Sequence, residues 1–173
     1  GYTYHLTAGK GGGNRTYEAG HGVETANYDP NDMGFLYSPN EWYIYGEGGY
    51  TQYAPKNKRL QQYSFSLNSV YTRLYEPYRF SDFAINASSF VLWKSRFAVG
   101  LDARIEPVAT YDYFEPRTSD FSRYLVWPEN WMVSGLISSD YRKPVAYDIK
   151  FSYRDFKTEG RTSTTFYISP RFR

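Results

Sequence analysis

The sequence contains no cysteine and only two histidines, His5 and His21. A disulfide framework and a thiolate metal site are therefore both excluded, and a zinc site would need further ligands at suitable spacing. We interpret the two histidines as polar residues on strands, and we expect no catalytic residue, no metal and no cofactor. The net charge of +2 is too small to favour nucleic acid as a partner.

Long apolar runs are also missing. No uncharged stretch approaches the ~18 apolar residues that a membrane helix needs. No signal peptide is visible, since Gly1 opens directly into a strand-like pattern. We expect that an exported protein with this N-terminus has been processed or is an internal segment of a longer chain.

Three motifs of binding or catalysis fail on inspection. The glycine-rich segment 8–14 lacks the GxxxxGK[ST] order of a phosphate loop, so a tight hairpin explains it better. No G-x-S-x-G elbow supports a serine hydrolase. The segment 29–32 resembles a calcium loop, but Met33 replaces the third oxygen ligand of an EF-hand. Turn chemistry of Asp and Asn beside Pro explains this segment more simply, and a bound calcium stays an open question.

The sequence is instead rich in aromatic residues, which make up 21% of the chain, with 20 Tyr, 12 Phe and 4 Trp. Its mean hydropathy is nevertheless −0.66. Tyr has a large apolar ring and a polar tip, so it suits surfaces that contact both apolar matter and water. Membrane interfaces are the main place that needs many such surfaces.

Alternation with period two runs through nearly the whole chain and predicts half-buried β-strands. The segments 96–106 and 145–154 are the clearest, because all of their charged residues fall on one parity and most of their apolar residues on the other. A shift of one residue would invert this division, so the register is strongly specified. In segment 14–26, His21 shares a parity with Tyr17, Ala19 and Val23. Because a histidine is unexpected among these residues, we predict a different register for that glycine-rich strand.

We predict an all-β fold of about nine strands, near residues 2–10, 14–26, 41–54, 60–75, 79–93, 95–107, 129–141, 144–156 and 160–173. These segments average about 13 residues, whereas strands of soluble proteins usually have ~5–6. At ~3.3 Å per residue and a ~45° tilt, such a strand spans ~30 Å, the thickness of a bilayer's hydrocarbon core. The sequence therefore predicts an antiparallel transmembrane β-barrel of the outer-membrane type.

Taken alternately along the chain, one set of connections is short and the other contains both long loops, as in outer-membrane barrels. The short turns fall at 11–13, 55–59, 94–95 and 142–143 and are basic wherever they carry charge. The other set contains the long loops 27–40 and 108–128 beside brief links at 76–78 and 157–160. Because outer-membrane barrels have short periplasmic turns and longer outer loops, we place the short turns in the periplasm. Trp93 and Tyr141, just before short turns on the apolar parity, are predicted to belong to an aromatic girdle.

The charged parity faces the lumen in this interpretation. The candidate lumen residues are Arg96, Asp102, Arg104, Glu106, Asp148, Lys150 and Arg154. They could line an aqueous pore, or they could pair across strands as a ladder that fills the lumen. In the second long loop, a set of aromatic residues could stack on sugar rings, although packing within the loop and a membrane aromatic belt are the simpler explanations. These residues are Tyr111, Tyr113, Phe114 and Trp127.

Four segments together resemble a known family. They are Tyr-Asp-Pro-Asn-Asp-Met-Gly-Phe-Leu at 28–36, Tyr-Asp-Tyr-Phe-Glu-Pro-Arg at 111–117, Ser-Ser-Asp-Tyr-Arg-Lys at 138–143 and Ile-Ser-Pro-Arg-Phe-Arg at 168–173. In this order they are similar to the Bacteroidota outer-membrane barrel family known as domain of unknown function 5916. The resemblance implies a barrel that follows a carbohydrate-binding-like domain related to family 9 and that continues past the segment resembling 168–173. It carries no functional residues over.

We therefore expect residues 1–173 to be a single segment of an outer-membrane barrel domain, truncated at both ends. Further strands, or a partner chain, are expected because nine strands leave open edges. The expected partners are outer-membrane lipid and lipopolysaccharide, with other envelope proteins or a glycan as further candidates. The leading functional hypothesis is transport of a solute, such as a glycan-derived compound. The alternative is a structural or binding subunit of an envelope complex, or a membrane mount for a carbohydrate-binding domain.

Overall fold

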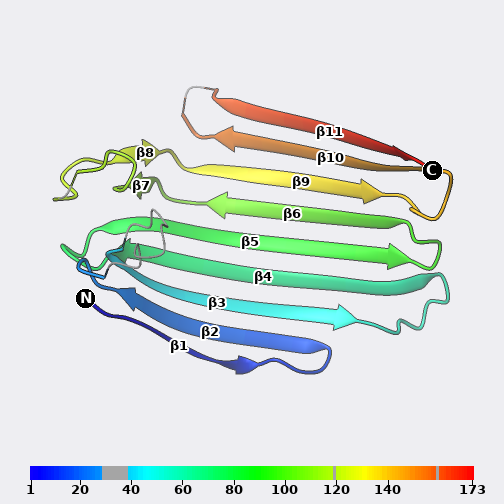
Figure 1. Cartoon of the computed structure of the whole chain (residues 1–173), viewed down its shortest axis with the longest axis horizontal. Helices are drawn as coiled ribbons and strands as arrows, with labels where there is room; N and C mark the ends of the chain where they lie inside the picture. Colours follow the sequence, from blue (N-terminus) through cyan, green and yellow to red (C-terminus); the bar gives the residue numbers. More distant parts are fainter. Residues whose placement is uncertain (29–38, 119, 159) are drawn as a thin grey trace.

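A single curved antiparallel sheet forms most of the protein (Figure 1). The structure is a computed structural model, and it describes residues 1–28, 39–118, 120–158 and 160–173. The nine strands of this sheet follow one another in chain order, each paired with its neighbours. They are β1 (Thr3–Lys10), β2 (Arg15–Glu24), β3 (Glu41–Gln52), β4 (Leu60–Leu74), β5 (Phe80–Trp93), β6 (Ala98–Glu106), β9 (Asn130–Ser138), β10 (Val145–Phe156) and β11 (Thr162–Phe172).

The predicted antiparallel sheet and its nine strands are confirmed, because each predicted segment contains one of these strands. The sheet is not closed: β1 and β11 are its two edges, and no pairing joins them within the described part of the chain. No helix among the described residues is long and apolar enough to cross a membrane.

The loop between β6 and β9 contains a feature that the alternation did not predict. Two short strands, β7 (Thr110–Asp112) and β8 (Leu125–Trp127), pair as a separate antiparallel ribbon. The ribbon packs against β5, where the Ser81 hydroxyl donates to the Tyr111 carbonyl at 3.1 Å. Strands of three residues are too short to show a period of two, so the sequence pattern gives no signal for them.

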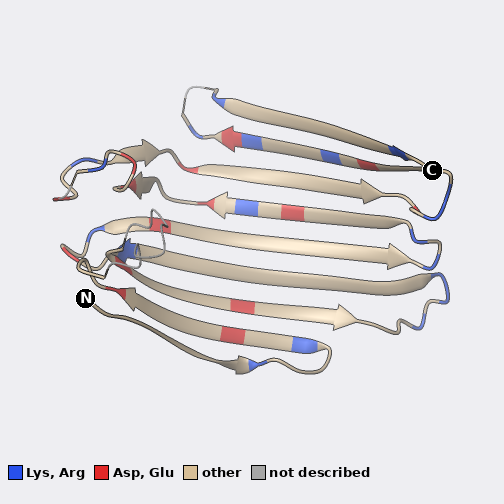
Figure 2. Cartoon of the chain, in the orientation of Figure 1, with Lys and Arg blue, Asp and Glu red and all other residues tan. Residues whose placement is uncertain are grey.

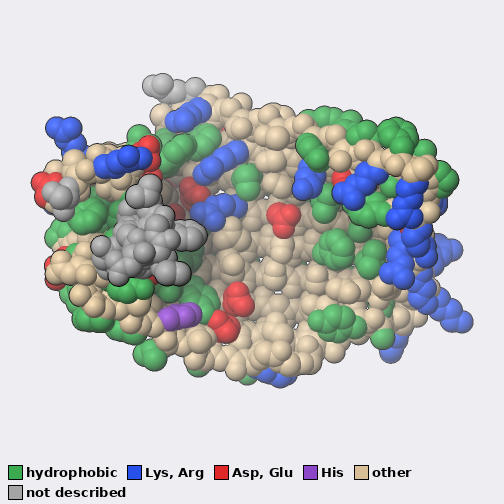
Figure 3. Space-filling view, viewed as in Figure 1, with side chains coloured by type: hydrophobic (Ala, Val, Ile, Leu, Met, Phe, Trp, Pro, Cys, Tyr) green, Lys and Arg blue, Asp and Glu red, His purple; other side chains and the backbone are tan. Residues whose placement is uncertain are grey.

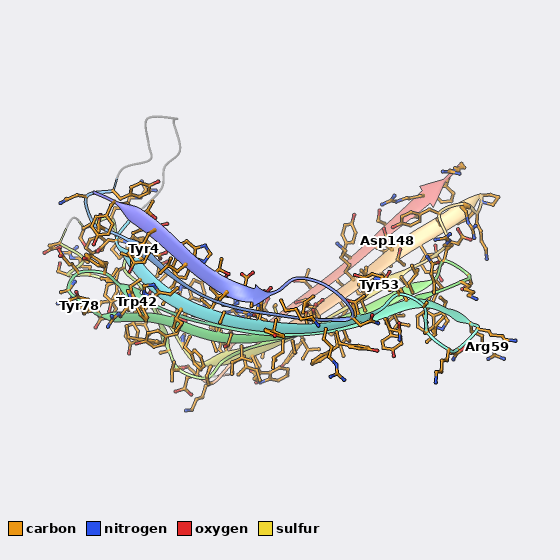
Figure 4. The ribbon with its side chains drawn as sticks, turned by 90° about the horizontal axis from the view of Figure 1, so that it is seen from below. Tyr4, Trp42, Tyr53, Arg59, Tyr78 and Asp148 are labelled. Atoms are coloured by element: carbon orange, nitrogen blue, oxygen red, sulfur yellow. The ribbon has the colours of Figure 1, made fainter. Side chains whose placement is uncertain are left out.

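The pairing register gives the sheet two faces of opposite character. The polar face carries Asp102, Arg104 and Asp148, and we call the other face, with Leu101 and Phe151, the apolar face. Because side chains alternate along each strand and register partners share a face, one assignment fixes the face of every paired residue. The sheet curves into a trough, with the labelled Tyr4 and Trp42 of the apolar face on its outer side (Figure 4).

Large apolar side chains lie uncovered on the apolar face. Leu6 is 66% exposed, Phe65 is 52% exposed and Leu101 is 53% exposed. Apart from the short β7–β8 ribbon beside β5, no second sheet within the described ranges packs against the main sheet, so these residues do not form the core of a two-layered sandwich. Uncovered apolar faces of this extent are typical of surfaces that contact another apolar phase or a partner.

Candidate functional site

The polar face is the candidate site, because it carries most of the charged residues of the described strands, including all of those near the middle of the strands. Six of the seven predicted lumen residues lie on it, three on β6 and three on β10. Arg96 does not belong to the sheet. It lies in the turn between β5 and β6 with a φ of +67°, because β6 begins only at Ala98. Figure 2 marks the charged positions along the strands, and Figure 3 shows acidic and basic side chains on the face in view.

A hydrogen-bonded ladder crosses the polar face near the end that carries the long loops. The Glu106 carboxylate, only 6% exposed, accepts from Arg104 Nε at 2.7 Å and from Asn130 Nδ2 at 2.7 Å. Arg154 donates through Nη2 to the same carboxylate at 3.3 Å and through Nε to Asn130 Oδ1 at 2.8 Å. A buried charge needs partners of this kind, since desolvation without them is costly.

The ladder continues on the other side of Arg104. Arg104 Nη1 donates to Asn86 Oδ1 at 3.1 Å, and Asn86 Nδ2 donates to Asn68 Oδ1 at 2.8 Å. The register explains this chain, because Asn68, Asn86 and Arg104 are direct partners across β4, β5 and β6. These asparagines and Asn130 were not predicted as site residues. Their shared parity with the charged residues is the signal that could have found them.

A second cluster surrounds Asp148 near the short-turn end. Its carboxylate accepts from the Ser138 hydroxyl at 2.7 Å and from the Tyr141 hydroxyl at 2.5 and 2.6 Å. Arg171 Nη2 lies 3.3 Å from the same carboxylate, and its guanidinium lies 4.3 Å from the centre of the Tyr141 ring. The prediction that Tyr141 belongs to an apolar girdle is therefore wrong. β9 ends at Ser138, so the alternation no longer decides where Tyr141 points.

Between these clusters, one register row consists almost entirely of small side chains. The row runs through Thr16, Gly49, Ser66, Ser88, Asp102, Ser134, Ser152 and Thr165. The Ser66 and Ser88 hydroxyls lie 2.7 Å apart. Small hydroxyl side chains leave free space above the sheet while remaining able to hydrogen-bond to water or to a solute.

A groove of about 340 Å³ lies where this row crosses β6, β9 and β10. Its polar-face lining includes Asp102, Ser134, Lys150 and Tyr167. Asp102 makes no hydrogen bond or ion pair with the rest of the described chain. Lys150 likewise forms no ion pair there, and its ammonium lies 5.9 Å from the centre of the Tyr167 ring. Two opposite charges thus flank the groove without neutralising each other. Tyr167 was not predicted as a site residue, although it shares a parity with Arg171.

Two tyrosine rings cover glycines on the polar face near the N-terminal edge. A Cβ atom added to Gly22 would lie 2.2 Å from the Tyr43 ring, and one added to Gly20 would lie 2.3 Å from the Tyr45 ring. A larger residue at either position would therefore require the tyrosine ring to move away. The His5 ring lies against both tyrosines, with centroids 6.0 and 5.8 Å away, and the Tyr45 hydroxyl donates to Glu18.

On the apolar face, aromatic rings form a continuous chain at the long-loop end. Successive ring centroids lie 5.6 Å apart from Tyr4 to His21, 5.0 Å from His21 to Trp42 and 6.2 Å from Trp42 to Tyr71. The chain continues through Phe80 to Tyr111. His21 therefore does lie on the apolar face, and the prediction of a different register for its strand is wrong. Trp93 lies on this face at the other end, against Phe97.

The loop aromatics pack against neighbouring rings. Tyr111 and Tyr113 both contact Tyr124, at 5.3 and 5.4 Å between centroids. Tyr113 is only 5% exposed, and burial raises the pKa of its hydroxyl. Of the other two predicted stacking residues, Phe114 contacts Phe121 at 5.6 Å.

Trp127, the last of these four, contacts Phe156 at 6.4 Å and so joins the ribbon to the end of β10. The four predicted stacking residues thus do not share a single open surface. The segments 28–36 and 29–32 lie largely or wholly outside the described residues, so the calcium question stays open.

Comparison with known proteins identifies a family for the whole chain. The family model described as "Domain of unknown function (DUF5916)" matches residues 1–173. The chain belongs to this family. The membership in domain of unknown function 5916 that the four sequence segments predicted is thereby confirmed. No curated protein and no solved structure matches the chain.

The polar face of this DUF5916 chain offers hydrogen bonding and charge. No group of three or more His, Asp or Glu side chains in the described ranges is arranged to hold a metal ion. What the face presents is a row of hydroxyls, a paired ladder and two unpaired charges beside a groove. Such an arrangement suits contact with water or with a polar solute.

Proposed function

We propose that the chain forms part of the wall of a β-barrel in the outer membrane of a Gram-negative bacterium, and that a small polar solute passes along its polar face. The observation that carries this proposal is the division of charge between the faces. In the described strands, four charged residues fall on the apolar face by register, and each lies within two residues of a strand end: Lys10, Arg15, Arg73 and Asp155.

This placement follows from the cost of charge in a bilayer. A charged side chain facing lipid near mid-bilayer costs ~2–4 kcal/mol, but little near the interfaces. The middle of the apolar face instead carries uncovered residues such as Phe65, Leu67 and Leu101. The aromatic chain at one end matches the ring girdles that border the apolar band of such barrels.

Closure of the wall is part of the proposal. Every backbone donor and acceptor in a bilayer must be paired, and the outer edges of β1 and β11 have no partner strand within the described residues. Further strands, from the same protein or from a partner, would pair with both edges. The long loops would face outward and the short, basic turns inward.

The row of small side chains favours passage over a purely structural role. Ser66, Ser88, Ser134 and Ser152 leave the centre of the polar face open, and the groove between Asp102 and Lys150 lies beside them. The ladder around Glu106 favours the alternative, a wall that mounts another domain or subunit, because its charges are already paired. The two functions share the membrane assignment and differ in whether the lumen conducts.

We expect the full-length protein, reconstituted in a planar bilayer, to conduct ions with a selectivity that depends on Asp102. Replacing Asp102 with Lys makes both charged residues of the groove wall basic, which attracts anions and repels cations. The reversal potential in a salt gradient should shift toward anion selectivity, with a change of at least about twofold in the permeability ratio.

Ser69→Ala is the control for this experiment, because Ser69 lies on the apolar face and should not alter selectivity. A protein that inserts but does not conduct would contradict the transport function and favour the structural alternative.

A further inference from the structure

Arg73 is a cation on the apolar face that the proposed function does not use. It is the second-last residue of β4, and its register partner is Trp42. Its guanidinium carbon lies 4.2 Å from the centre of the Trp42 ring and 4.9 Å from the centre of the Tyr78 ring. Figure 4 labels Trp42 and Tyr78 at the same end of the sheet.

Among the described residues the Arg73 guanidinium has no acceptor. Its Nε is buried without a hydrogen-bond partner in that part of the chain, and none of the ion pairs there involves Arg73. Arg carries five N–H donors in a planar fork, and a desolvated donor without an acceptor is destabilising. The two rings hold the cation in place by cation–π contact without supplying an acceptor. This arrangement is suited to an anion that arrives from outside the chain.

An apolar groove lies on the same face beside Arg73. Its volume is about 440 Å³, and it is lined by Tyr71, Phe80, Phe83, Val108, Ala109 and Tyr111. Tyr71 lies two residues before Arg73 on β4, and its ring contacts both the Trp42 ring at 6.2 Å and the Phe80 ring at 5.5 Å. The groove and the guanidinium are therefore connected by one continuous set of rings.

We propose that Arg73 and this groove bind one membrane lipid, with the lipid phosphate on the guanidinium and an acyl chain in the groove. This inference rests on the proposed membrane location. The charges are complementary, and the planar fork of Arg binds two phosphate oxygens at once. The site lies at the aromatic chain near the strand ends, which is where a lipid headgroup meets its chains.

The test uses the full-length protein in nanodiscs of phosphatidylcholine that contain spin-labelled phosphatidylglycerol. Electron spin resonance gives the association constant of the anionic lipid relative to phosphatidylcholine. We expect Arg73→Gln to lower this constant roughly fivefold. The phosphate of phosphatidylcholine is already balanced by its own choline, whereas the net negative charge of phosphatidylglycerol gains most from the charge-assisted pair with Arg73. Arg73→Lys should retain only part of the preference, since an ammonium cannot bind the phosphate bidentately.

Arg59→Gln is the matched control. It also removes one positive charge, but from the turn at the opposite end of the sheet (Figure 4), where the side chain has no ring partner in the described chain. We expect less than about a twofold change for this variant.

The outcomes separate this inference from the proposed function. A protein that does not insert into nanodiscs would overturn the membrane location and the lipid site together. Insertion with an equal loss in Arg73→Gln and Arg59→Gln would overturn the lipid site alone, because only net charge would then matter. If the anion that Arg73 binds is instead a carboxylate of a protein partner, Arg73→Gln should leave the lipid preference unchanged. This result would also reject the proposal.

Discussion

Leu101→Arg and Ile149→Arg should each prevent or strongly impair assembly of the protein in the membrane. Both side chains lie on the apolar face near the middle of their strands, β6 and β10, and Leu101 is 53% exposed. An arginine at such a position would face lipid near mid-bilayer, which costs ~2–4 kcal/mol. The expected result is a large drop in the folded fraction in outer membranes, and a free energy of unfolding in vesicles lowered by about that amount.

Asp102→Leu and Lys150→Leu are the matched controls, because each changes charge on a neighbouring residue of the same strand but on the polar face. Neither residue forms an ion pair with another described residue, so no partner is left uncompensated. Both variants should assemble nearly as well as the natural protein. Equal assembly of all four variants would show that the assignment of lipid-facing and water-facing sides is wrong.

The alternation of the sequence predicted the sheet well because a register error is heavily penalised. In segments 96–106 and 145–154 a shift of one residue would bring every charge to the apolar face. The structure places Asp102, Arg104 and Glu106 on one face and Leu101 and Ile105 on the other, as predicted. The alternation was least clear in the glycine-rich strand that contains His21. There the simple alternation was right, and the predicted change of register was wrong.

The alternation could not predict what happens beyond the strand ends. In the sequence, Arg96 continues the charged positions of its segment and Tyr141 continues the apolar positions of its own. Both residues lie in turns, however, where backbone geometry and local hydrogen bonds set the direction of the side chain. In the turn that contains Tyr141, Arg142 holds the pKa of Asp140 well below its usual range through hydrogen bonds and charge. Such local contacts depend on how the turn folds in three dimensions, and the alternation of polar and apolar residues gives no information about that.

Contacts between strands were equally hidden. A single sequence shows that Asn68 and Arg104 share the polar parity of their strands, but not that Asn86 joins them. That link needs the pairing register of β4, β5 and β6. For the same reason the unpaired guanidinium of Arg73 stays invisible in the sequence, because its two ring partners come from β3 and from the turn after β4.

Glu106→Leu should destabilise the protein more than any other single change on the polar face. The Glu106 carboxylate is the common acceptor for Arg104, Asn130 and Arg154. Its removal leaves two guanidinium groups beside a leucine in a largely buried position. Loss of one partner of a fully buried ion pair costs ~3–5 kcal/mol.

The guanidinium groups are about one-third exposed, with 33% for the Arg104 side chain and 30% for Arg154, so water compensates part of the loss. We therefore expect the free energy of unfolding in vesicles to fall by about 2 kcal/mol. The measurement is a urea titration followed by tryptophan fluorescence. Asp102→Asn, which changes an unpaired carboxylate on the same strand and face, should change the unfolding free energy by less than about 0.5 kcal/mol.

The ladder also predicts coupling between its members. If Glu106 and Arg154 stabilise each other, the double variant Glu106→Gln with Arg154→Gln should be more stable than the sum of the single losses predicts, by about 0.5–2 kcal/mol. Equal effects of Glu106→Leu and Asp102→Asn, together with strict additivity in this cycle, would mean that the ladder contributes nothing to stability. The charged residues of β6 would then be available to interact with a solute, because none of them would be needed for the stability of the sheet.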